Sequence, residues 1–187
     1  MAFDFEALVG HIYVVGGRSL SAQPPGMLVE VAPKKAARGR ELDTIFVMAS
    51  PSGETTAPAA FYDEMGNQAA ERYFNSTGSV TAGLRTAVNA INESLVEHNN
   101  SGKRHYEANL LCAVLKDTEL FLARVGAGVA LYQHNSELFQ FPTEFSNDVA
   151  LFGPPLGVQP APDIKMAKYS VSQGSRLMLG DNRLVEL

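Results

Sequence analysis

The sequence predicts an α+β fold in which antiparallel sheets and helices are packed in layers. Three observations support this: short apolar runs fill the first third of the chain, two long stretches with helical periodicity follow, and strands separated by turns occupy the rest. Two helices between two blocks of antiparallel strand favour a layered sandwich whose helices cover sheet faces. The chain has 187 residues, of which 45% are hydrophobic, and no Pro/Gly-rich linker divides it. We therefore expect one domain spanning residues 1–187.

Three apolar runs in the first third predict strands, at 11–15, 27–31 and 44–49. A Pro-Pro-Gly turn at 24–26 separates the first two runs. The stretch 32–42 between the second and third runs is polar and basic, so we expect a solvated loop there.

Helical periodicity begins near residue 57. The stretch 57–74 is rich in Ala, Glu and Met, and four apolar residues within 79–98 recur at spacings of four, three and four. These residues are Leu84, Val88, Ile91 and Leu95. The spacing is typical of one face of an amphipathic helix, and the Asn-Asn-Ser-Gly sequence that ends at Gly102 suits a helix C-terminus.

The remainder of the chain predicts a β-meander. The runs 108–115 and 119–125 are expected to form a hairpin, because only three turn-forming residues separate them. Further strands are predicted at 129–134, 137–141, 164–171 and 176–179.

Composition excludes several classes of partner. The 15 Lys and Arg against 20 Asp and Glu give a net charge of -5, and this balance argues against nucleic-acid and anionic-membrane partners, which require concentrated positive charge. No apolar run is long enough for a membrane span, and Asp4 and Glu6 stand where a signal peptide carries basic residues. The single cysteine, Cys112, cannot form an internal disulfide, so we expect a cytoplasmic protein.

Four strings, taken in this order, resemble the metal-dependent serine/threonine protein phosphatases of the PP2C type. They are TIFVMASPSGE (44–54), SVTAGLRTAVNAINESLVEHN (79–99), ELFLARVGAGVALYQHNSELFQF (119–141) and GSRLMLGDNRLVEL (174–187). The resemblance implies a four-layer α-β-β-α sandwich of antiparallel sheets. Family members continue past the position that matches residue 187, so we expect a C-terminally truncated version of that fold or one part of a longer protein.

The resemblance also implies where the metal ligands should be. Phosphatases of this type hold two divalent cations with aspartates, because hard cations need anionic oxygen ligands. In this chain Ser50 stands at one aspartate position, followed by Pro51 in place of glycine, and Ala127 stands at another. Only Asp181 is retained, and one carboxylate cannot organise a pair of metal ions.

We therefore interpret the chain as a pseudophosphatase, a catalytically inactive phosphatase-like domain without a cofactor that acts as a binding or regulatory module. Its expected partners are another protein or further domains of a longer chain, and an open sheet edge could produce a homodimer. Arg18 aligns with the family's phosphate-binding arginine and could hold a phosphate; the simpler interpretation is an exposed arginine.

Two alternatives stay open. The chain could be an active phosphatase that holds Mg or Mn with Asp43, Glu54 or Asp63 together with Asp181, or an unrelated α+β protein. Cys112 lies in the apolar run LLCAVL and is predicted to pack in the core rather than act as a nucleophile. The four histidines are scattered, and no two have the spacing of a helical metal site.

Overall fold

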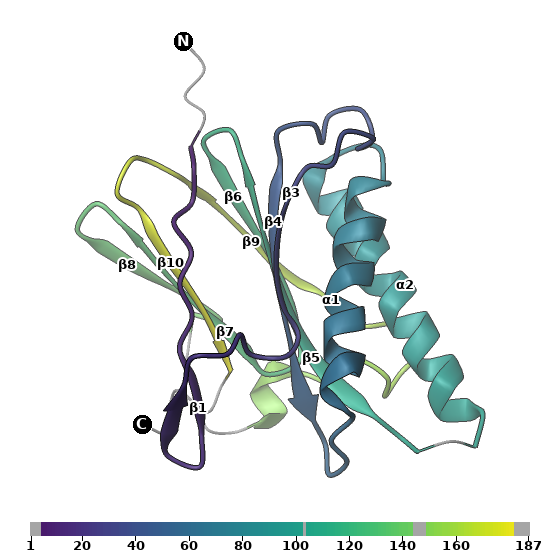
Figure 1. Ribbon diagram of the computed structural model, residues 1–187. Helices are drawn as coiled ribbons and strands as arrows, with labels where there is room; N and C mark the ends of the chain where they lie inside the picture. The colour runs from purple at the N-terminus through teal and green to yellow at the C-terminus, as the bar shows by residue number, and fades with distance from the viewer. Residues whose placement is uncertain (1–4, 103, 144–148, 182–187) are drawn as a thin grey trace.

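Two antiparallel sheets and a pair of helices build the molecule (Figure 1). The computed structural model describes residues 5–102, 104–143 and 149–181. The larger sheet has the order β3 (Met27–Val31), β4 (Thr44–Ser52), β5 (Glu107–Lys116), β6 (Glu119–Val125) and β9 (Lys165–Ser170). The smaller has the order β10 (Arg176–Asp181), β7 (Gly128–His134) and β8 (Glu137–Phe141). A separate hairpin joins β1 (Tyr13–Val15) to β2 (Arg18–Leu20).

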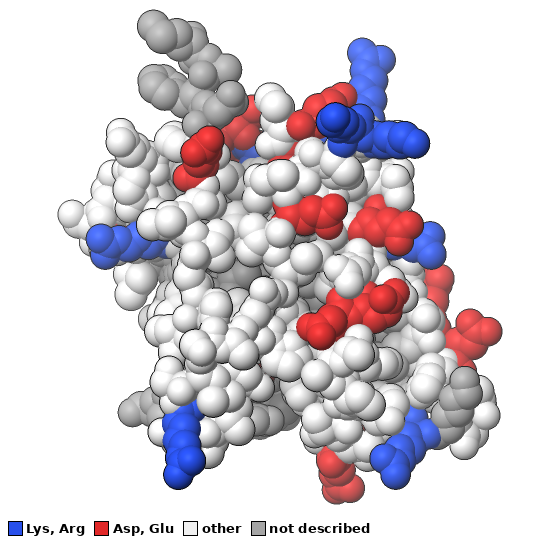
Figure 2. Space-filling model, viewed as in Figure 1, with Lys and Arg blue, Asp and Glu red and all other residues white. Residues whose placement is uncertain are grey.

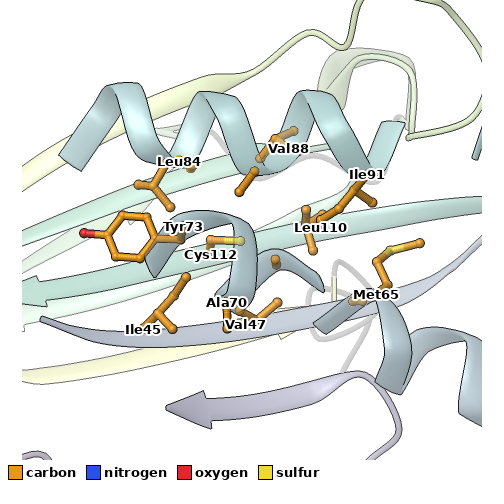
Figure 3. Close-up of a cluster of buried hydrophobic side chains, with 14 of the residues drawn as sticks. Ile45, Val47, Met65, Ala70, Tyr73, Leu84, Val88, Ile91, Leu110 and Cys112 are labelled. Atoms are coloured by element: carbon orange, nitrogen blue, oxygen red, sulfur yellow. The ribbon is translucent and has the colours of Figure 1, made fainter. Parts of the chain in front are cut away.

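The helices α1 (Ala59–Phe74) and α2 (Val80–Asn100) both cover one face of the five-stranded sheet. The side chain of Ser79 caps α2, its Oγ accepting a hydrogen bond from the backbone N–H of Ala82 at 3.2 Å. The apolar stripe of α2 faces the sheet, so that Leu84, Val88 and Ile91 pack over β4 and β5 (Figure 3).

Alternation along the central strands divides the core into two layers. In β5, Cys112 packs toward the helices, whereas Leu111 and Ala113 pack toward the three-stranded sheet. Because β5 is buried on both faces, its sequence is nearly continuously apolar and does not alternate with polar residues. The register places Cys112 opposite Val47 of β4.

The predicted antiparallel sandwich is confirmed, as is the hairpin of β5 and β6. Of the four predicted layers, the described residues form three: the helices, the five-stranded sheet and the three-stranded sheet. The reason is that α1 and α2 are joined by only five residues and pack side by side on the same sheet face. In the described part of the chain, the only helical turn outside them is a short 3-10 helix, η1 (Val149–Phe152).

The prediction of a solvated loop over 32–42 is wrong at Arg40. Lys34, Lys35 and Arg38 are exposed, but the Arg40 side chain is only 1% exposed. Its guanidinium donates hydrogen bonds to the Tyr73 hydroxyl at 3.2 Å and to the Ser79 carbonyl at 2.7 Å. The basic stretch therefore anchors the connection between the two helices.

Arg40 belongs to a buried polar network with Asp43. The Asp43 carboxylate accepts hydrogen bonds from the Tyr73 hydroxyl at 2.6 Å and from Lys116 Nζ at 2.9 Å, and it lies 3.6 Å from Arg40 Nη1. Burial and the bond to Asp43 raise the pKa of Tyr73 well above its usual range. Every charge in this network has an opposite charge beside it, as buried ions require.

Candidate functional site

Sheet register brings Ser50, Ala127 and Asp181 to one end of the sandwich. Ser50 on β4 lies opposite Asn109 on β5, and Asp181 on β10 lies opposite Gly128 on β7. Ala127 is in the turn between β6 and β7, directly before Gly128. In Figure 1 this is the lower end of the molecule, where β4 and β10 terminate.

Asn109 links the strands at this end. Its Nδ2 donates a hydrogen bond to the Pro51 carbonyl at 3.3 Å, and its Oδ1 accepts one from the backbone N–H of Ala127 at 2.9 Å. A side chain at position 126 would place its Cβ 2.2 Å from Asn109 Oδ1, and Gly126 has a φ of 74°, so this position requires glycine. Sequence reasoning missed Asn109, although a lone carboxamide within the apolar run ANLLCAVL was an available signal.

The two substituted positions contribute little that could bind a cation. The Ser50 hydroxyl is buried and has no hydrogen-bond partner, and Ala127 packs against Val129 and Phe152 in a small apolar cluster. Asp181 is half-buried at the end of β10. The three predicted positions therefore offer one carboxylate, one hydroxyl and one methyl group.

A buried arginine lies beside the same turn. Arg124 is 3% exposed, and its Nη1 donates hydrogen bonds to the Gly126 carbonyl and, at 3.1 Å, to the Phe152 carbonyl. The guanidinium also lies over the rings of Phe141 and Phe152, at 5.6 and 5.4 Å. Burial lowers the pKa of Arg124, while Asp163 favours its charged form. A guanidinium bonded to this turn repels a second cation there.

The residues present do not fit the two-metal centre that the resemblance implies. Such a centre needs a bridging carboxylate and several further oxygen ligands around ions about 3.5–4 Å apart. Within residues 5–102, 104–143 and 149–181, no group of three or more His, Cys, Asp or Glu side chains could hold a metal ion. Near the three predicted positions, this end of the sandwich instead combines the carboxamide of Asn109, the buried guanidinium of Arg124 and the carboxylate of Asp181, and Asp163 acts on Arg124.

The alternative ligand set of Asp43, Glu54 and Asp63 is not assembled around Asp181. Asp43 precedes β4, and seven residues of strand separate it from Ser50 by about 23 Å. Its carboxylate is already bound by Lys116 and Tyr73. Asp63 lies on α1, where its Oδ1 accepts a hydrogen bond from the Gly26 N–H at 2.8 Å, and Glu54 is exposed after β4.

Arg18 lies exposed on β2, in the hairpin at the lower end of Figure 1. Its predicted role toward phosphate remains a prediction. The prediction that Cys112 packs in the core is confirmed, because the residue is 1% exposed and burial raises its thiol pKa to about 12. His98 lies at the end of α2, and its imidazole stacks on Tyr106 with 5.5 Å between the ring centres.

No model of a known protein family matches the sequence, and no curated protein matches it. Solved structures do match. The serine/threonine phosphatase Stp1 from Staphylococcus aureus is 11% identical and aligns over 94% of this chain and 76% of its own, with a TM-score of 0.65. The chain has the phosphatase fold. The likeness to PP2C-type phosphatases expected from the four strings is thus confirmed at the level of fold.

Two further structures show the same likeness. The catalytic domain of the phosphatase PstP, solved in complex with two manganese ions, is 14% identical over 88% of this chain and 74% of its own, with a TM-score of 0.58. PppA, described as a key regulatory component of T6SS in Pseudomonas aeruginosa, is 14% identical over 83% of this chain and 69% of its own, with a TM-score of 0.60. Among the described residues, no helix is both long and apolar enough to cross a membrane.

Proposed function

We propose that residues 1–187 form a single pseudophosphatase domain that binds or regulates a protein partner and does not hydrolyse phosphate esters. The observation that carries this proposal is that Ser50 and Ala127 stand where the family resemblance places aspartates, at the end of the sandwich where Asp181 also lies. A phosphatase of this fold needs metal-bound water as its nucleophile, and metal needs clustered carboxylates.

Local contacts support an inactive site. The carboxamide of Asn109 bridges Pro51 and Ala127 with neutral hydrogen bonds, so the backbone at this end is held without a cation. Arg124 adds a positive charge next to the Gly126–Ala127 turn. Both features disfavour cation binding at the place where the resemblance locates it.

We infer a regulatory or binding role because the chain keeps the phosphatase fold but lacks most of the aspartates that would ligate metal. PppA, which has this fold, is described as a regulatory component, and this precedent supports the same class of role here. We further propose a cytoplasmic location, no cofactor, and a partner that is either another protein or further domains of a longer chain. The net charge of -5 makes nucleic acid an unsuitable partner.

Metal titration and an activity assay test this proposal together. We expect isothermal titration calorimetry with Mn²⁺ and Mg²⁺ to show no saturable binding, and p-nitrophenyl phosphate to show no turnover above buffer. The active alternative, favoured by the manganese ions of PstP and by the retained Asp181, predicts the opposite.

Paired variants make the result specific. Asp181→Asn removes the retained carboxylate, and Asp117→Asn removes a carboxylate from the β5–β6 turn, at the end of β5 away from Asn109. Saturable Mn²⁺ binding with turnover, both abolished by Asp181→Asn and unaffected by Asp117→Asn, would overturn the proposal.

A further inference from the structure

The N-terminal arm, residues 5–15, is rich in residues that favour β-strands, but most of the arm lies outside any strand. The run 11–15 predicts a strand, but only Tyr13–Val15 is one, and it pairs with β2 alone. Leu8 is 102% exposed and Ile12 is 86% exposed. Burying one such side chain contributes about 1.5–3 kcal/mol, so a contact that covered these side chains would be stabilised substantially.

Among the described residues, β10 is the end strand of its sheet, and its outer edge suits such an arm. Within the described part of the chain, β10 pairs with β7 and with no other strand. Its Met178 is 42% exposed. By contrast, the outer edge of the larger sheet at β9 carries Lys165 and Lys168, the kind of charged side chains that protect an edge from further pairing.

We propose that two copies of this chain form a reciprocal dimer in which the N-terminal arm of each copy pairs with the outer edge of β10 of the other. In the view of Figure 1, the arm runs past β10 to the hairpin without joining either sheet. Reciprocal exchange gives both copies the same contacts, as twofold symmetry requires. The inference concerns assembly and is independent of catalysis.

Charge permits this contact. The chain carries a net charge of -5, which would make two copies repel each other at most surfaces. The arm and its hairpin carry only Glu6 and Arg18, and β10 carries only Arg176 and Asp181, so each surface is neutral. Figure 2 agrees: acidic side chains gather over the right-hand part of the view, toward the helices, and most of the left-hand part is uncharged.

The arm and its hairpin expose several large apolar side chains that a dimer could bury. Six large apolar side chains between positions 8 and 20 are more than 40% exposed: Leu8, Val9, Ile12, Val14, Val15 and Leu20. A contiguous apolar patch above a few hundred Å² is unusual for a monomer. Because exchange buries two such arms and two β10 edges, the contact can reach the roughly 800 Å² per partner of a stable interface.

Light scattering coupled to size-exclusion chromatography tests the dimer on the full chain, up to about 100 μM, a range that detects micromolar association. We expect a dimer, and because each substitution is present in both arms, we expect Leu8→Lys and Ile12→Lys each to raise its dissociation constant by about 100-fold or more. Both side chains are exposed in the single chain, so the melting temperature of the monomer should not fall. Val158→Lys, which changes a 49% exposed side chain on a loop outside the arm and β10, is the matched control and should leave the dimer unchanged.

Disulfide trapping tests the pairing itself. An Ile12→Cys chain and a Met178→Cys chain with different tags are mixed and oxidised, and we expect one covalent heterodimer that joins the two introduced thiols. The native Cys112 is buried and will not interfere. A monomer throughout the concentration range, a dimer indifferent to the arm substitutions, or failure of the two thiols to join would each refute the proposal.

Discussion

Replacing Arg40 with methionine is expected to destabilise the fold by about 3 kcal/mol. A buried ion pair that loses one partner typically costs about 3–5 kcal/mol, because the other charge is left buried and uncompensated. Here Asp43 keeps its hydrogen bonds from Lys116 and Tyr73, which places the loss at the lower end of that range. The Ser76 carbonyl loses its donor at 3.3 Å, whereas the Ser79 carbonyl still accepts from the Gly83 N–H.

Thermal unfolding followed by circular dichroism measures this effect. For a chain of this length, 3 kcal/mol corresponds to a fall in melting temperature of about 10 °C. Arg38→Met is the matched control, because Arg38 lies two residues away in the same basic stretch and is exposed. We expect that control to change the melting temperature by no more than about 1–2 °C, as surface substitutions do. Equal shifts for the two variants would refute the reasoning that burial of Arg40 stabilises the fold.

Three further predictions concern the same core. In a urea titration, Gly83→Ala should lower the free energy of unfolding despite a helix-propensity gain of about 1 kcal/mol, because the new Cβ would lie 2.5 Å from Arg40 Nη2. Gly66→Ala is the control: its Cβ would meet nothing closer than 3.5 Å, so it should raise the free energy of unfolding. Burial and Asp43 raise the pKa of Tyr73. The neutral hydroxyl therefore contributes fully to stability below about pH 10, and this contribution is lost as the pH rises further. Between about pH 8 and 10.5 the urea midpoint of Tyr73→Phe should fall less than that of the unchanged protein. With a pKa of about 12, Cys112 should not react with Ellman's reagent at pH 8 in the native state, and one thiol per chain should react in urea.

The strands could be predicted closely because burial leaves a direct trace in the sequence. The predicted ranges 119–125 and 137–141 coincide with β6 and β8, since turn-forming residues bound each run. The hairpin strand β2 was missed because three residues, Arg18–Leu20, are too few to show alternation. The periodic pattern gave the buried faces of the two helices but not the sheet on which they pack, and the described residues place both helices on the same sheet face.

Long-range polar contacts could not be predicted. Arg40 and Tyr73 are 33 residues apart, and nothing near Arg40 in the sequence indicates that α1 ends beside it with a hydroxyl and a ring to receive the guanidinium. The same limit applies to Asn109, whose partners are Pro51 near the end of β4 and Ala127 in the turn between β6 and β7. Sequence reasoning predicted Ser50 and Ala127 as substituted positions, but it could not say what holds the backbone there.

The proposed function requires the scaffold to persist without metal, and the contacts at this end of the sandwich are compatible with that requirement. Clustered aspartates repel one another unless cations neutralise them, so a centre that lost its metals but kept its acids would be destabilised. In this chain serine and alanine stand at two of those positions, and Asn109 ties Pro51 to Ala127 with bonds that need no ion. Arg124, on the neighbouring strand β6, then supplies a positive charge that is internal to the fold. Under the function proposed above, these contacts hold this end of the sandwich without an ion, so the fold would not depend on metal binding.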